Sequence, residues 1–493
     1  MRPIIASVLL AATLSAPAAE KPNVLFIAVD DMRPDLGCYG VDFVKTPNLD
    51  KLAASGTIFT QAYCQQAVCS PSRTSLLTGK RPDTTKVWDL ETHFRDHIPD
   101  TVTLPQQFKQ HGYHAVGMGK IYHGGFDDKA SWSEPHRSPK GTTGYARPEN
   151  QKILEESRQS GRERGLKGRA LRRSGRGPAS EAADVSDDTY HDGVVAEMAV
   201  ESLQSLSKRD EPFFLAVGFV KPHLPFVSPK KYWDLYDRSQ FSLPANYDHA
   251  PKNAPPFAGT NWGELRAYSD IPPKGALSKE KALELMHGYY AALSYMDAQL
   301  GKVLDELDRL GLAENTIVVV WGDHGWKLGE HGMWCKHTNY ELDARVPLVV
   351  RAPGKKPGTA SDGLVEFVDV YPTLCDLAGL PAPDDLEGTS FAPLLDDPNQ
   401  EWKTAAFSQY PRSHDGQRLM GYSLKTDRYR FTRWVDRKNP KKVVALELYD
   451  HETDPAENVN VAGEAKYADA VEELSALADG GWKGVRGKLL DED

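Results

Sequence analysis

The chain has 493 residues, and its 59 basic and 69 acidic side chains give a formal net charge of −10. Hydrophobic residues make up 40% of the chain, and the 40 glycines and 34 prolines are too few for a collagen-like or low-complexity protein. The acidic balance argues against sequence-independent binding of nucleic acid, which needs a basic surface. An anionic ligand therefore has to be held by a local cluster of cations.

The N-terminus has the pattern of an export signal. A basic Arg2 precedes an apolar stretch over residues 4–14, and the small residues Ala16 and Ala18 flank Pro17 at a cleavage site. This pattern predicts a signal peptide over residues 1–19 and an exported protein, either periplasmic or secreted. No later run approaches the ~18 apolar residues that a membrane span needs, so no span is predicted.

Cysteine is scarce in this chain, and its count is odd. The five cysteines are Cys38, Cys64, Cys69, Cys335 and Cys375. An odd count in an exported protein leaves at least one thiol unpaired, and the sequence does not assign the pairing of the others. Disulfides are therefore not expected to be the main support of the fold.

Four continuous apolar runs end abruptly in polar residues. They span residues 23–29, 114–118, 213–219 and 316–321. Continuous rather than alternating apolar runs indicate strands buried on both faces, as in a parallel sheet covered by helices. Because ligands bind beyond the carboxyl ends of such strands, the four polar clusters predict one shared site.

The remaining pattern predicts helices and a division into two parts. Apolar residues at helical spacing predict helices over residues 279–310, 105–112 and 195–206. We expect a catalytic α/β domain over residues 20–390 and a smaller α+β subdomain over residues 391–493.

A basic insertion interrupts the first part of the chain. Residues 158–176 carry seven arginines and one lysine against a single acid, Glu163, with glycine and serine between them. Charge runs are usually solvated loops, so we interpret this segment as a solvated, partly flexible insertion. If it binds anything, a polyanionic chain is the natural partner.

Residues 69–79 read C-S-P-S-R-T-S-L-L-T-G and predict a short helix with an anion site at its start. Pro71 suits the first turn and Gly79 suits the end of the helix. Cys69 then lies at the helix N-terminus, where free N–H groups attract anions, and Arg73 lies one turn further on. The bare C-x-P-x-R pattern is equally compatible with a structural cysteine before a short helix.

The longer string resembles the formylglycine motif of the type I sulfatases. Residues 23–40, 65–85, 213–226 and 322–347 resemble one branch of that family, the iduronate-2-sulfatase-like enzymes. The resemblance spans nearly the whole chain after residue 20, except the basic insertion. It implies an alkaline-phosphatase-like α/β sandwich with a mostly parallel central sheet and a smaller C-terminal α+β subdomain.

The resemblance also implies a modified nucleophile and a metal. Cys69 matches the cysteine that a formylglycine-generating maturation enzyme oxidises to 3-oxoalanine (formylglycine). The implied metal ligands are residue 69 together with Asp30, Asp31, Asp323 and His324. Three carboxylates that converge at strand ends repel one another unless a cation joins them. Ca²⁺ is the expected ion and Mg²⁺ is the alternative.

Cationic residues complete the implied site. Lys120, His123, His223 and Lys336 match positions that hold sulfate oxygens or move protons. Arg73, Lys120 and Lys336 are expected to neutralise charge on the sulfuryl group. His123 is expected to act as the base on formylglycine, and His223 as the acid that protonates the leaving alkoxide.

The substrate signal is weaker. His93, Trp326 and Trp334 are candidates for contact with a sugar, although core packing is at least as good an explanation for each tryptophan. The resemblance implies hydrolysis of sulfate esters on carbohydrates, in the degradation of a sulfated polysaccharide or oligosaccharide. The alternatives are a phosphomonoester or phosphonate hydrolase of the same superfamily, and a non-catalytic protein that binds polyanions through the basic insertion.

Overall fold

The computed structural model describes residues 21–485, so the expected signal peptide lies outside the described residues. Its centre is an eight-stranded sheet with the strand order β11-β2-β10-β7-β1-β5-β3, and β12 also pairs with β2. The strands of this sheet are β1 (Asn23–Val29), β2 (Thr57–Tyr63), β3 (His114–Gly119), β5 (Phe213–Phe219), β7 (Thr316–Gly322), β10 (Arg345–Arg351), β11 (Thr359–Ser361) and β12 (Val365–Glu366).

The four apolar runs of the sequence form the parallel half of this sheet. β1 lies between β5 and β7 and is parallel to both, and β3 is parallel to β5. β10 runs antiparallel to β7 and β2, so the sheet is mixed but mostly parallel, as expected. The carboxyl ends of β3, β5, β1 and β7 therefore meet at one edge.

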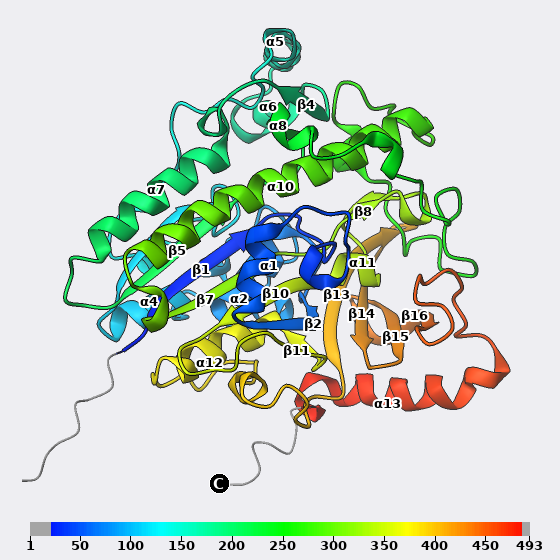
Figure 1. The fold of residues 1–493 in the computed structure, drawn as a ribbon. Helices are drawn as coiled ribbons and strands as arrows, with labels where there is room; N and C mark the ends of the chain where they lie inside the picture. Colours follow the sequence, from blue (N-terminus) through cyan, green and yellow to red (C-terminus); the bar gives the residue numbers. More distant parts are fainter. Residues whose placement is uncertain (1–20, 486–493) are drawn as a thin grey trace, which may run out of the picture.

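Helices cover both faces of the sheet, which gives three layers (Figure 1). Leu25, Ile27 and Val29 of β1 face one core with the long helix α10, and the residues between them face a second core with α2, α4 and α12. The helices are α1 (Pro47–Ala54), α2 (Cys69–Thr78), α3 (Pro82–Thr85), α4 (Leu104–Gln110), α5 (Pro148–Glu163), α6 (Gly168–Ser174), α7 (His191–Leu206), α8 (Lys230–Trp233), α9 (Gly263–Arg266), α10 (Lys279–Arg309), α11 (Glu341–Ala344), α12 (Phe367–Leu377) and α13 (Ala468–Gly484).

The C-terminal part forms a separate antiparallel sheet beside the large one (Figure 1). Its strands follow one another in the order β13 (Ala406–His414), β14 (Gln417–Lys425), β15 (Tyr429–Asp436) and β16 (Asn439–Asp450). Helix α13 packs on β15. This sheet and helix agree with the smaller α+β part that the sequence predicts, while the boundary at residue 391 stays a prediction.

Short strands complete the fold. β4 (Ser180–Ala183) pairs in parallel with β6 (Phe226–Pro229), and β8 (Lys327–Leu328) pairs with β9 (Trp334–Cys335). Within the described residues, no helix combines the length and apolar character needed to cross a membrane.

The basic insertion is not the loop that we expected. Helix α5 extends into it as far as Glu163, and helix α6 occupies Gly168–Ser174. The expectation was wrong because a high charge density does not prevent a helix whose arginines and glutamates pair along its surface, as Arg162 pairs with Glu155. Arg158, Arg162 and Arg164 are exposed, which agrees with the solvated character of the segment.

Candidate active site

The acids that follow β1 and β7 lie together because these strands are neighbours in register. Val29 pairs with Gly322, so Asp30 and Asp31 lie next to Asp323 and His324. The Asp31 amide donates to Asp323 Oδ1 over 3.0 Å. Asp31 has a φ of 61°, a left-handed conformation that is costly for a residue other than glycine. Such strain at the edge of a ligand-binding sheet is typical of a functional turn.

The donor atoms fit a bound cation. One ligand atom each from Asp30, Cys69, Asp323 and His324 lies within 4.8 Å of the others, and all four residues are buried. The His324 Nε2 is also 3.4 Å from Asp31 Oδ1. Several carboxylate oxygens in one buried site suit Ca²⁺ or Mg²⁺, and a cation there would relieve their mutual repulsion.

Cys69 is the first residue of helix α2, as expected. Val68 precedes it in extended conformation, and Gly79 ends the helix with a φ of 65°. Its Sγ lies 3.3 Å from both Asp30 Oδ1 and His324 Nε2. The helix N-terminus therefore presents residue 69 directly to the acids at the strand ends.

The rest of helix α2 fixes this geometry. The Ser72 hydroxyl donates to the backbone oxygen of Asp323. Arg73 is fully buried, and its guanidinium joins Asp323 at 2.8 Å to Asp30 at 3.4 Å. Further Arg73 hydrogen bonds reach the backbone oxygens of Lys120 and Ile121. Arg73 thus ties three chain segments together beneath residue 69.

A close approach between the backbones of β3 and β5 positions Lys120 in the site. Gly119 has a φ of 70°, and a Cβ there would lie 2.1 Å from the Gly218 oxygen. Only glycine at these strand ends lets the Lys120 amide bond the Gly218 oxygen at 2.9 Å. The Lys120 Nζ then contacts Asp30 and lies 3.8 Å from Cys69 Sγ.

His223 and Lys336 reach the same place from other loops. His223 Nε2 lies 3.9 Å from Asp31 Oδ2, and Lys336 Nζ lies 2.9 Å from Asp31 Oδ1. Glu264, on the short helix α9, joins them: its carboxylate is 3.1 Å from His223 Nε2 and 2.9 Å from Lys336 Nζ. No sequence pattern marks Glu264, because a single acid on a one-turn helix has no periodic neighbours.

Burial and charge set the protonation states of these groups. Burial alone would raise the pKa of Asp30, but the neighbouring Lys120, His223 and Arg73 outweigh it and lower that pKa well below its usual value. Burial raises the pKa of Asp31 and that of the Cys69 thiol. A buried thiol with a raised pKa is a poor nucleophile.

Some of the residues of this site line a cavity of about 510 Å³. The expected site residues Cys69, Lys120, His123, His223 and Lys336 are among its lining residues, and Glu264 is the only acid among the described ones. Three further basic side chains that were not expected at the site also line this cavity, namely Arg176, His191 and His337.

Three expected substrate contacts do not reach this cavity. Trp326 and Trp334 are at most 1% exposed and belong to the hydrophobic core, so neither indole offers a face to a sugar ring. The alternative of core packing explains both. His93 does not line the cavity; its ring stacks on Phe94 and its Nδ1 accepts from the Arg95 amide.

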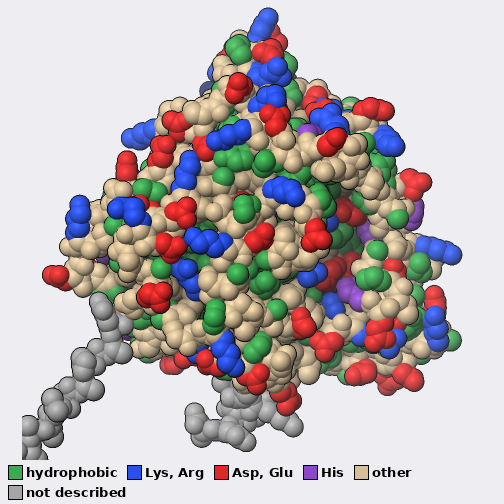
Figure 2. Space-filling model, viewed as in Figure 1, with side chains coloured by type: hydrophobic (Ala, Val, Ile, Leu, Met, Phe, Trp, Pro, Cys, Tyr) green, Lys and Arg blue, Asp and Glu red, His purple; other side chains and the backbone are tan. Residues whose placement is uncertain are grey.

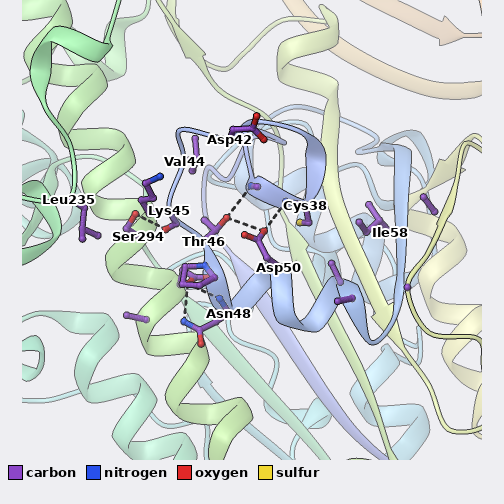
Figure 3. Close-up of a pocket in the computed structure, with 18 of the residues that line it drawn as sticks. Cys38, Asp42, Val44, Lys45, Thr46, Asn48, Asp50, Ile58, Leu235 and Ser294 are labelled. Carbon is purple, nitrogen blue, oxygen red and sulfur yellow. Dashed lines mark hydrogen bonds between the residues drawn. The ribbon is translucent and has the colours of Figure 1, made fainter.

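A second, larger cavity lies away from these residues, beside helix α1 (Figure 3). It measures about 850 Å³, and its labelled lining residues include Cys38, Asp42 and Lys45. Cys38 is partly exposed, and no disulfide joins any of the five cysteines of the described chain. None of the expected site residues lines this cavity.

The outer surface shows no dominant charge on the face that Figure 2 presents, where acidic and basic side chains alternate. On this face no single basic patch stands out as an anion site. The cavity described above gathers Lys120, Lys336 and Arg176.

Comparison with known proteins agrees with this geometry. The family model "Sulfatase" matches residues 22–380, and the model "N-sulphoglucosamine sulphohydrolase, C-terminal" matches residues 329–479. Iduronate 2-sulfatase of Mus musculus is 34% identical, over 93% of this chain and 94% of its own length.

Solved structures share the fold. One, in complex with its substrate D-glucosamine-2-N,6-O-disulfate, has a TM-score of 0.73 and 24% identity and covers 96% of this chain and 100% of its own. The phosphonate monoester hydrolase from Silicibacter pomeroyi also has a TM-score of 0.73, at 21% identity, and covers 94% of this chain and 96% of its own. The extent of the family match and the identity to the mouse enzyme decide the family: the chain belongs to the sulfatases, in their iduronate-2-sulfatase-like branch, and is a sulfuric ester hydrolase.

Proposed function

We propose that this enzyme hydrolyses sulfate esters on carbohydrates, with formylglycine at position 69 and a divalent cation. One observation carries the proposal: Cys69, at a helix N-terminus, lies within 3.8 Å of an acid, a histidine and a lysine at the ends of parallel strands. A sulfated sugar is the substrate class because the relatives named above include an iduronate 2-sulfatase and a protein bound to a sulfated glucosamine.

Formylglycine supplies a hydrated aldehyde with two hydroxyl groups, one for attack on sulfur and one whose later loss of a proton allows sulfate to leave. A separate formylglycine-generating enzyme, with its own oxidant, would convert the cysteine. The position of residue 69 at the start of α2 supports this assignment, because the free N–H groups there favour developing negative charge.

A divalent cation would be held by Asp30, Asp31, Asp323 and His324 together with the group at position 69. When bound, it would polarise a sulfate oxygen and lower the pKa of the nucleophile. The abundance of carboxylate oxygens favours Ca²⁺, with Mg²⁺ as the alternative.

The chain's own cations act on the sulfuryl group. Lys120 and Lys336 line the cavity beside residue 69, where their ammonium groups neutralise the charge that grows on the transferring oxygens. Arg73 lies beneath them and holds Asp30 and Asp323 in place. These buried charges need no reorganisation during the reaction.

Two histidines move the protons. His223, held by Glu264 at 3.1 Å, donates a proton to the sugar oxygen as the S–O bond breaks. His123, which lines the same cavity, accepts the proton from the formylglycine hydroxyl when sulfate is released.

The enzyme is proposed to act outside the cytoplasm, in the periplasm or after secretion, on a sulfated polysaccharide or oligosaccharide. The export pattern of residues 1–19 supports this location. The division into residues 20–390 and 391–493 is likewise proposed, on the shift from the large sheet to the antiparallel sheet.

Sulfate release from defined sulfated oligosaccharides, followed by ion chromatography, tests this function. We expect release from at least one sugar sulfate, its loss in Cys69→Ala, and its retention in Cys38→Ala, a matched control at the other cavity. No release from any sugar sulfate by protein modified at residue 69 would overturn the proposal.

A phosphonate or phosphomonoester hydrolase is the second candidate, because the fold matches the Silicibacter pomeroyi enzyme over nearly the whole chain. Matched aryl sulfate and aryl phosphate esters separate the two functions. A higher kcat/KM for the sulfate supports the first, and a higher value for the phosphate supports the second.

A further inference from the structure

The last residue of the basic insertion, Arg176, lines the active-site cavity, whereas Arg158, Arg162 and Arg164 of the same segment are exposed to solvent. The strand register explains its position. β4 and β6 are parallel with Ser180 opposite Phe226, and the Phe226 amide donates to the Ala179 oxygen at 2.8 Å. The residues that precede β4 therefore run alongside the loop that carries His223.

Among the described residues, no counter-ion holds the Arg176 side chain. Its guanidinium lies over the ring of Tyr268, 5.3 Å from the centroid, and its amide donates to the Ser157 hydroxyl. Within the described part of the chain, no carboxylate forms an ion pair with Arg176, and its buried Nε has no hydrogen-bond partner. A stacked guanidinium without a counter-ion is prepared to bind an anion.

The other charged side chains that line the cavity pair with groups other than Arg176. Glu264, the single acid among the described lining residues, is engaged by His223 and Lys336. Lys120 contacts Asp30, and Lys336 contacts Asp31. Both lysines in the lining thus have a carboxylate partner, whereas Arg176 has none among the residues that the structure describes.

We propose that Arg176 binds a second anionic group on the substrate, separate from the sulfate that is cleaved. The inference rests on the proposed function, because it places a sulfated sugar in this cavity. A planar guanidinium pairs in two parallel hydrogen bonds with a carboxylate, so a uronic acid carboxylate fits best. A second sulfate has the same charge and is distinguished by experiment.

Kinetics with Arg176→Gln test the inference on three substrates. These are a 2-O-sulfated uronic acid, a disulfated hexosamine without a carboxylate, and a 4-nitrophenyl sulfate that has no second anion. Loss of a hydrogen bond to a charged group corresponds to a fall of about 10- to 100-fold in kcat/KM. We expect that fall on a substrate with a second anion and less than about 3-fold on the nitrophenyl ester, which bounds any effect of misfolding.

The control variant is Arg164→Gln, which removes the same charge from an exposed position in the same segment. This variant should change kcat/KM by no more than about 3-fold on any of the three substrates. Arg176→Lys should restore only part of the lost activity, because lysine keeps the charge but not the planar pair of donors.

The outcomes separate the alternatives. A loss confined to the uronic acid identifies a carboxylate, and a loss confined to the disulfated sugar identifies a sulfate. Equal losses on all three substrates, or no loss on any, would overturn the role of Arg176.

A binding measurement tests the role of Arg176 independently of the proposed function. Calorimetry in the Cys69→Ala background measures affinity for the same two sugars without turnover. If the wild type releases no sulfate, the proposed function fails, while a 10- to 100-fold weaker Kd on adding Arg176→Gln still supports an anion site. An unchanged Kd for both sugars would overturn it.

Discussion

His223 is the residue whose assigned role is most open to test by chemistry. It lies 3.1 Å from Glu264 and faces the cavity beside residue 69. If it protonates the leaving alkoxide, it matters for a sugar alcohol, which is a poor leaving group, and much less for nitrophenolate. We expect His223→Gln to lower kcat about 10²- to 10⁴-fold on a sugar sulfate. On 4-nitrophenyl sulfate the loss should be far smaller, and equal losses on both esters would rule out the acid role.

Glu264 is expected to act through His223 as a positioning residue. Its carboxylate also holds Lys336; burial alone would raise its pKa, but Lys336 and His223 outweigh burial and keep that pKa well below the usual range. Glu264→Gln should reduce kcat on a sugar sulfate by about 10-fold, with a smaller effect on 4-nitrophenyl sulfate. Glu314→Gln, at an exposed position, serves as the control. An equal loss of activity on the sugar sulfate and on 4-nitrophenyl sulfate would indicate a structural role for Glu264 instead.

The meeting point of site residues that follow predicted strands could be predicted from the sequence. The position of isolated site residues elsewhere could not. Asp30, Asp31, Asp323 and His324 follow apolar runs that can only be buried strands, so their meeting point follows from parallel pairing. Glu264 lies on the one-turn helix α9, and Arg176 lies in the segment before the short strand β4, where no periodicity marks a site. Trp326 and Trp334 lie beside the site in sequence, but their size and apolar character place them in the core.

At the level of elements, a buried ionic network ties the start of α12 to the chain after α2. Arg81 binds both oxygens of Glu366 at 2.7 and 2.9 Å, and Lys403 lies 2.9 Å from the same carboxylate. The Glu366 Oε1 also accepts from the Phe407 amide in β13, so the network reaches the C-terminal sheet. Lys403 further contacts Asp369 in the first turn of α12.

Removing one member of this network should destabilise the fold and change its response to acid. Burial alone would raise the pKa of Glu366, but Arg81 and Lys403 outweigh it and lower that pKa to about 2. Its stabilising effect is therefore complete above the unfolded pKa of about 4.5 and is lost as the pH falls toward 2. Glu366→Gln should lower the free energy of unfolding at pH 7 by about 3–5 kcal/mol.

The measurement is denaturant unfolding between pH 7 and pH 3. The wild type should lose stability over this range more steeply than Glu366→Gln, because only in the wild type does the unfolded chain bind a proton at residue 366 that the folded carboxylate does not. Parallel pH curves for the two proteins would show that Glu366 does not titrate as described.

The helices were easier to predict than the basic insertion. The spacing of apolar residues located α10 almost to its ends, because one face must pack on the sheet. Helices α5 and α6 have no face that packs on the sheet, so their run of charges favours a loop. Arg–Glu pairs such as Arg162 with Glu155 allow the helix to form there. A solvated helix lacks the apolar stripe by which a helix is predicted from its sequence.

For the whole molecule, a divalent cation should join the two halves of the site and stabilise the fold. Asp30 and Asp31 follow β1, Asp323 and His324 follow β7, and residue 69 begins α2, so one ion would link three segments. Binding at 100 times its Kd adds about 2.7 kcal/mol of stability. We expect the Tm to fall on treatment with EDTA and to recover with Ca²⁺ or Mg²⁺ in a concentration-dependent manner.

The control for metal dependence is Asp323→Asn, whose Tm should respond less to EDTA and to added metal. Recovery with one ion and not the other identifies the preferred cation. A Tm that is the same with and without EDTA in the wild type would contradict a metal site at these strand ends.

Residue 69 is expected to work as an aldehyde and not as a thiol. The most direct test is mass spectrometry of the peptide containing residue 69, from protein made in its native host and assayed for sulfate release in parallel. We expect the mass of formylglycine or its hydrate at this position, and activity proportional to the modified fraction. Full sulfate release from protein that carries only unmodified cysteine at position 69 would contradict it.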